Sequence, residues 1–138
     1  MAMTSSSGSG AVATGREVSI SVLDATGTPV ADANVRLYVD GTFYGQALTR
    51  SGSLRPITLS IEDATASVRV VVDVPGHLPR EAVLDPGRND AHFVYPRARS
   101  GLATVAPGLQ PLAVCPDGTS NWPCIICRSG DRQWRICV

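Results

Sequence analysis

The sequence contains no lysine, because all twelve basic residues are arginine. Without a lysine amine the chain cannot form a Lys–Asn isopeptide crosslink, and Schiff-base, P-loop and lysine general-base chemistry are excluded as well. The twelve acidic residues bring the formal net charge to zero. No overall positive field is therefore present to attract a polyanion, and we expect no nucleic-acid partner.

Aromatic residues and long apolar runs are also scarce. Aromatic side chains make up only 5% of the chain, so a core must be built from Val, Leu, Ile and Ala. No apolar run approaches the length of about 20 residues that a membrane-spanning helix needs. Residues 1–16 are rich in Ser, Gly and Thr and lack the basic start and apolar stretch of an export signal. We interpret them as a flexible leader, or alternatively as an arm that becomes ordered on assembly.

Short alternating segments begin at Glu17 and continue to Arg97. In "EVSISVL" the apolar residues occupy every second position, as a half-buried strand requires. Asp40-Gly41 separates two such segments and predicts a two-residue hairpin, because both turn positions favour positive φ. Counting "NVRLYV", "TFYGQAL", "ITLSI", "SVRVVVDV", "REAVL" and "AHFVYP" as well, the pattern predicts a seven-stranded antiparallel β-sandwich in residues 17–97.

Part of this region resembles the carboxypeptidase regulatory-like domain of the transthyretin-like (prealbumin-like) β-sandwiches. The matching features are Val22-x-Asp24-x-x-Gly27-x-Pro29-Val30, Ala33-x-Val35-x-Leu37, and a Val-rich strand before Pro75-Gly76-His77. The family's central "T-D-x-x-G-x-F" segment differs here, because "TRSGSL" lacks the acid and the aromatic residue. The resemblance implies an Ig-like sandwich that acts as an accessory, folding or binding module.

The sequence does not predict an enzyme. A hydrolase branch of the transthyretin superfamily, acting on hydroxyisourate, uses clustered His and Arg residues and a terminal "YRGS"-type motif. Here the nearest match is "YPRA" at 95–98, and the two histidines are separate. We expect His77 to lie in an exposed loop rather than to act as a general base, and His92 to be a packed or edge histidine of a strand rather than a ligand. Four aspartates at 24, 32, 40 and 73 do not form the D-x-D-x-D loop of a calcium site.

All four cysteines lie in the last 24 residues, after a Pro- and Gly-containing connector at 98–114. Cys115, Cys124, Cys127 and Cys137 could bind one zinc ion, because a C-x-x-C pair supplies two thiolates from one knuckle. They could instead form two disulfides that stabilise a small tail. A Cys124–Cys127 bridge would close a strained ring, so in that case Cys115 and Cys137 would each pair with one of the inner two.

A third interpretation of the cysteines is a redox site, since "WPCIIC" is loosely similar to the thioredoxin motif. Thioredoxin chemistry needs that motif at a helix N-terminus, which lowers the thiol pKa. The segment "CIICRSGDRQWRIC" alternates like a β-hairpin instead. The sequence leaves zinc, disulfides and reactive thiols open. Zinc would favour a cytoplasmic protein, and disulfides would favour one exported by a non-standard route.

Both tryptophans and three arginines accompany the cysteines. Trp122 and Trp134 either pack over the cysteines as a small core or are exposed binding anchors. Arg128, Arg132 and Arg135 belong to a residue type that is enriched at interface hot spots. These five residues are the candidate binding residues of the tail.

Three functional hypotheses remain. The first is a non-catalytic protein-binding or assembly module with a cysteine-clamped C-terminal β-hairpin. The second is a structural subunit of an extracellular or injected assembly, crosslinked through its termini. The third is a small zinc-binding or thiol-redox protein. The expected partner is another protein or a second copy of the chain.

Overall fold

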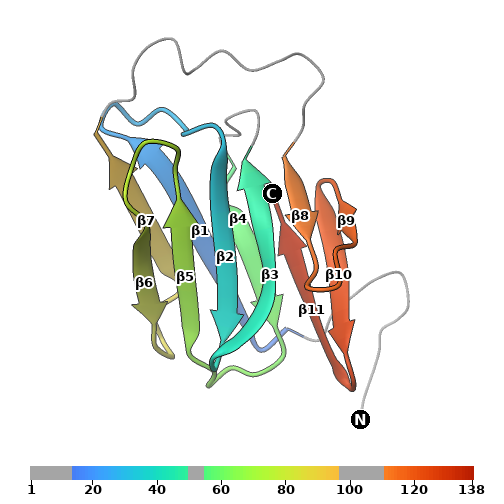
Figure 1. The fold of residues 1–138 in the computed structure, drawn as a ribbon. Helices are drawn as coiled ribbons and strands as arrows, with labels where there is room; N and C mark the ends of the chain where they lie inside the picture. The colour runs from blue at the N-terminus through green and yellow to red at the C-terminus, as the bar shows by residue number, and fades with distance from the viewer. Residues whose placement is uncertain (1–13, 50–54, 97–110) are drawn as a thin grey trace.

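The computed structural model describes residues 14–49, 55–96 and 111–138, and this part of the chain is all β (Figure 1). The seven segments expected to be strands between Glu17 and Arg97 are all strands. Four further strands follow in the C-terminal part. The strands are β1 (Arg16–Asp24), β2 (Ala33–Val39), β3 (Thr42–Thr49), β4 (Ile57–Ile61), β5 (Val68–Asp73), β6 (Arg80–Leu84), β7 (Asp90–Tyr95), β8 (Leu112–Val114), β9 (Ser120–Asn121), β10 (Cys124–Ser129) and β11 (Arg132–Cys137).

The strands form two sheets that face each other. One has five strands in the order β10-β11-β4-β1-β7, and the other has six in the order β6-β5-β2-β3-β8-β9. In the longer strands, alternation of apolar residues places one side of the strand between the sheets, as Val18 and Ile20 of β1 and Val35 and Leu37 of β2 show. The core is accordingly aliphatic, with few aromatic side chains in it.

One strand pair departs from the expected antiparallel arrangement. β1 pairs with β4 antiparallel but with β7 in parallel, from Ser19 opposite Asp90 to Asp24 opposite Tyr95. The chain reaches β7 from β6, which belongs to the other sheet. No hairpin therefore fixes the direction of β7 relative to β1, and alternation alone does not reveal it.

The β2–β3 hairpin forms as the sequence predicts, and it contains an irregularity that the sequence does not predict. Asp40 and Gly41 have φ angles of 48° and 84°, as the two-residue turn requires. Two pairs further along, Leu37 lies opposite Gly45 while Tyr38 lies opposite Phe43, so Tyr44 is an extra residue in β3. This β-bulge turns the side chain of Tyr44 inward, and Tyr44 is buried.

The cysteine-containing tail is part of both sheets. β8 extends the six-stranded sheet by pairing with β3, with Ala47 opposite Ala113. The expected C-terminal hairpin is present as β10 and β11, and β11 pairs with β4, with Ile136 opposite Leu59. The expected connector at 98–114 thus ends in a strand, while its residues 98–110 lie outside the described part of the chain.

The expected leader also differs at its end. Residues 1–13 lie outside the described part, but Arg16 is the first residue of β1 and only 5% exposed. Its guanidinium donates hydrogen bonds to the Asn89 side chain at 2.9 Å, to the backbone oxygens of Leu84 and Asp85 at 3.2 and 2.7 Å, and to those of Ala66 and Arg88. Arg16 therefore ties together three chain segments at one end of the sandwich.

Candidate functional site: a groove beside the disulfide-linked tail

The four cysteines form two disulfides, Cys115–Cys127 and Cys124–Cys137. This overturns the zinc interpretation, because no cysteine is free and the described residues hold no group of three or more His, Cys, Asp or Glu side chains that could bind a metal. Of the pairings that the sequence left open, the structure has one in which each outer cysteine joins an inner one. The disulfides indicate an oxidising, non-cytoplasmic environment.

The physical reason for the correction is the position of the C-x-x-C pair on a strand. Residues three apart in a strand point to opposite faces of the sheet. Cys127 is 2% exposed and bonds inward to Cys115, which is 5% exposed at the end of β8. Cys124 lies on the opposite face and bonds to its direct cross-strand partner Cys137. A zinc knuckle or a thioredoxin-like site would need both sulfurs of the pair on one side of a tight turn or helix.

The Cys115–Cys127 disulfide links the two sheets, because β8 and β10 belong to different ones. Directly opposite Cys127 on β11 is Trp134, which is 1% exposed. The indole stacks on the ring of Tyr44 with centroids 3.9 Å apart, and its N–H donates to the Tyr44 carbonyl oxygen at 2.6 Å. Trp134 is therefore a core residue that joins the tail to β3, rather than an exposed anchor.

A groove of ≈ 660 Å³ opens beside these residues. One wall is the start of β3, the second is the β8–β9 turn, and the third is the tip of the β10–β11 hairpin. The lining includes the aromatic residues Phe43, Tyr44 and Trp134 and the charged residues Asp117, Arg128, Asp131 and Arg132. Its volume is within the range of about 300–1,000 Å³ found for ligand sites.

The expected binding residues divide between this groove and other surfaces. Arg128 and Arg132 line the groove and are exposed. Arg135 follows Trp134 and therefore points to the outer face of the five-stranded sheet, beside buried Ser60. Trp122 is 47% exposed and precedes β10, outside the lining of the groove. With Trp134, whose buried ring also lines the groove, the structure thus brings three of the five candidates together.

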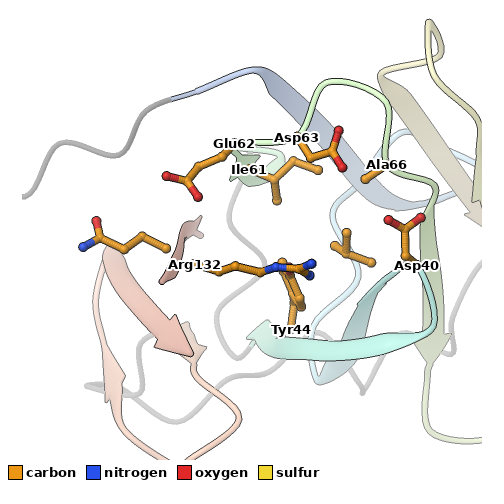
Figure 2. A pocket seen from close by; sticks show the side chains of 9 residues that line it. Asp40, Tyr44, Ile61, Glu62, Asp63, Ala66 and Arg132 are labelled. Atoms are coloured by element: carbon orange, nitrogen blue, oxygen red, sulfur yellow. The ribbon is translucent and has the colours of Figure 1, made fainter. Parts of the chain in front are cut away.

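Arg132 also borders a second, smaller pocket of ≈ 90 Å³. Figure 2 shows its side chain extending past Tyr44 toward Asp40, with Asp63 on the facing segment. The guanidinium donates to the Tyr44 hydroxyl at 3.2 Å, and this contact, followed by Asp40 and Asp63, raises the pKa of Arg132. Arg132 is therefore held at the tip of the hairpin, between the two pockets.

Asp117 takes part in a local turn at the rim of the groove. Its Oδ1 accepts hydrogen bonds from the Thr119 N–H at 2.9 Å and the Thr119 hydroxyl at 2.7 Å. These bonds lower the pKa of Asp117 because they favour the charged form of the carboxyl group. Asp63 makes the same contacts with Thr65. The carboxylate of Asp117 therefore fixes the shape of the β8–β9 turn.

The two histidines lie on different elements, His77 between β5 and β6 and His92 on β7. His92 is an exposed residue of β7, whereas His77 is only partly exposed and packs edge-on against Tyr95 with ring centroids 5.1 Å apart. His77 lies in the loop before β6 as expected, but it is not fully exposed, because it packs against Tyr95.

Sequence reasoning missed the part of the groove contributed by β3. Phe43 and Tyr44 appeared there only as ordinary strand residues, although the following Gly45 was a usable signal. Gly45 has a φ of 126°, and an added Cβ would collide with the carbonyl oxygen of Val114 and lie 2.8 Å from Cδ1 of Ile136. A glycine inside a strand often marks a bulge or a close backbone approach, and this one marks both.

The described residues include no helix long and apolar enough to cross a membrane. Comparisons of the chain with protein-family models, with curated proteins and with solved structures gave no match.

Proposed function

We propose that this protein is a non-catalytic protein-binding module, working in an oxidising compartment, whose binding site is the groove beside the disulfide-linked tail. The observation that carries the proposal is the composition of the groove. Phe43 supplies exposed aromatic surface above the buried rings of Tyr44 and Trp134, and Arg128 and Arg132 supply cations; aromatic residues and arginine are enriched in the central contacts of protein interfaces.

The construction of the groove supports a binding role. Its walls come from both sheets, and the Cys115–Cys127 disulfide and the Tyr44–Trp134 stack join those sheets beside it. A site held by a disulfide and a buried ring stack is ordered before a partner binds, so binding costs little conformational entropy. We further infer a transthyretin-like sandwich from the motifs at Val22–Leu37, and an accessory role within a larger system agrees with that resemblance.

The alternative of a structural subunit crosslinked through its termini has less support. All four sulfurs are bonded within the chain, so an intermolecular disulfide would require one of these bridges to open. Sedimentation velocity with and without reductant distinguishes the two roles. A binding module sediments as a small species in both conditions, whereas a crosslinked subunit gives high-mass species that reductant dissolves.

A photo-crosslinking experiment tests the binding role itself. A benzophenone amino acid is placed at Thr42, on the wall of the groove, and in a matched control at His92, on β7 far from it. Each oxidised protein is irradiated in an extract of the source organism, and crosslinked products are identified by mass spectrometry. The proposal predicts discrete protein adducts that occur from position 42 and not from position 92. Equal, diffuse adducts from both positions would refute it.

A further inference from the structure

The first residues of β3 have a neighbouring strand on one side only. β3 runs from Thr42 to Thr49, and β2 pairs along that length. On its other side β8 covers only Gln46, Ala47 and Leu48. The chain then turns back from β8 into β9, and the N–H of Cys115 donates to the Thr119 oxygen at 2.8 Å. Within the described part of the chain, no strand pairs with Thr42–Gly45 on this side.

The backbone of Phe43 faces this open side. Val39 and Thr42 flank the two-residue turn and form the first pair of the hairpin, which is the hydrogen-bonded kind in such hairpins. The next pair, Tyr38 and Phe43, is then of the non-hydrogen-bonded kind, so the N–H and C=O of Phe43 point away from β2. They point toward the groove, which Phe43 lines.

The open edge and the groove occupy the same place. The β8–β9 turn, with Cys115 and Pro116, forms the end of the groove that lies in line with β8. The carbonyl oxygen of Tyr44 already accepts a hydrogen bond from the Trp134 indole N–H. The N–H and C=O of Phe43 are therefore the backbone groups on this stretch to which an incoming strand would bond. An incoming strand would continue the line of β8 along β3, as peptides do when they extend a sheet edge.

The charges on the opposite wall indicate the side chain that such a strand would carry. Arg128 and Arg132 are both exposed at the tip of the β10–β11 hairpin, and a guanidinium group matches a carboxylate through two parallel hydrogen bonds. Asp117 and Asp131 also line the groove; Oδ1 of Asp117 accepts two hydrogen bonds within its own turn, and Asp131 lies in the turn between β10 and β11. Arg132 also lines the smaller pocket, whereas Arg128 lines the groove alone, so Arg128 is the cation that we assign to the ligand.

We infer that the groove binds an extended peptide segment of a partner protein, which adds to the open edge of β3 at Phe43 and places a carboxylate side chain against Arg128. This inference rests on the proposed function and specifies its ligand class. The contact is short, so side chains that fill the groove above Tyr44 and Trp134 supply part of the affinity.

The first experiment selects ligands from a phage-displayed library of linear twelve-residue peptides on the oxidised protein. The inference predicts enriched sequences that combine Asp or Glu with β-branched or aromatic residues. Titration of one selected synthetic peptide should show binding that weakens as salt rises. Arg128→Gln should weaken binding by about tenfold, whereas the matched control Arg88→Gln, on the exposed β6–β7 turn, should leave it unchanged.

Two variants of Phe43 separate backbone from side-chain contributions. Phe43→Ala removes the ring and keeps the N–H, whereas Phe43→Pro removes both at a position where β2 does not use the N–H. Proline should weaken peptide binding by at least about tenfold more than alanine does. If Phe43→Pro fails to fold, single N-methylation along the peptide replaces it. Methyl groups on alternate residues should then abolish binding, and those on the intervening residues should not.

The outcomes distinguish the inference from the proposed function. If peptides are selected but Arg128→Gln and the Phe43 variants bind them normally, the inference is wrong and another surface carries the binding. If N-methylation has the same effect at every position, edge addition is wrong although the groove is a binding site. If no peptide is selected and the crosslinker at Thr42 gives no adduct, the proposed function fails as well.

Discussion

Removal of each disulfide separately should show that the bridge between the sheets stabilises the fold more than the bridge between neighbouring strands. The two bridges have sequence separations of 12 and 13, so the loop-closure entropy of the unfolded chain is nearly the same for both, about 3 kcal/mol. If this entropy were the whole effect, C115A/C127A and C124A/C137A would lose equal stability.

The difference between the two variants comes from burial. The sulfurs of Cys115 and Cys127 lie in the core, where truncation to alanine leaves space beside Trp134, whereas Cys124 and Cys137 are partly exposed. Each buried atom removed costs about 1 kcal/mol in lost burial and cavity formation. We therefore expect C115A/C127A to lose about 5 kcal/mol and C124A/C137A about 3 kcal/mol of unfolding free energy.

Urea unfolding followed by tryptophan fluorescence measures both values, because buried Trp134 becomes exposed when the tail separates from β3. Each variant keeps one intact bridge and no free thiol, so disulfide exchange does not complicate the transition. Equal losses in the two variants, or a larger loss in C124A/C137A, would refute the argument that burial makes the inter-sheet bridge the more important one.

Three further changes have defined outcomes. Gly45→Ala should lower the free energy of unfolding by about 2–4 kcal/mol, because a Cβ there meets Val114 and Ile136. Gly27→Ala, at a positive φ but in open space, should lower it by only about 1 kcal/mol. Equal losses in the two urea denaturation curves would contradict the argument that Val114 and Ile136 leave no room for a side chain at position 45. Arg16→Met should cost more than about 3 kcal/mol, because it leaves four buried or partly buried carbonyl oxygens without their donor, and urea curves equal to those of wild type would show that water replaces the guanidinium. Thr119→Val should raise the pKa of Asp117 toward its ordinary value in an NMR titration, because the hydroxyl bond that lowers it is lost. A lowered pKa stabilises the folded state at pH values above the ordinary pKa, and this contribution disappears as pH falls through the folded-state pKa. The variant should therefore be less stable than wild type at neutral pH and equally stable in acid. An unchanged Asp117 titration would refute the assignment.

The strands of the sandwich were predictable because their periodicity is strong. Val18, Ile20 and Val22 repeat every second residue, and the prediction that they share a buried face is confirmed. The Asp40-Gly41 turn was predictable for a different reason, since few residue pairs tolerate positive φ at both positions. Both signals come from residues that are close in the sequence, so they can be interpreted without knowing which strands pair.

The partners of the strands were much less predictable, because pairing depends on long-range geometry. Nothing in the composition of β7 reveals that it runs parallel to β1. In the same way, the tail was expected to be a separate clamped hairpin, yet β8 and β11 complete the two sheets. Their apolar residues Ala113 and Ile136 are core positions whose partners lie far away in the chain.

The sequence predicted the arginines of the candidate site but not its aromatic residues from β3. Arg128 and Arg132 stood out because they cluster near the cysteines, whereas Phe43 and Tyr44 belong to a hairpin more than 80 residues earlier. Alternation also resolves the cysteine question in retrospect. Positions 124 and 127 on a strand point to opposite faces, which excludes one metal ion between them.

Amide hydrogen exchange at Phe43, measured by NMR in the free protein and with a selected acidic peptide, tests the central claim most directly. The account predicts that this amide exchanges rapidly in the free protein, because no strand covers it, and that it slows at least about tenfold when the peptide binds. Thr42, whose amide faces β2, should change little. An amide of Phe43 that is already protected in the free protein would contradict the account. So would slowing confined to the edge strands β6 and β7.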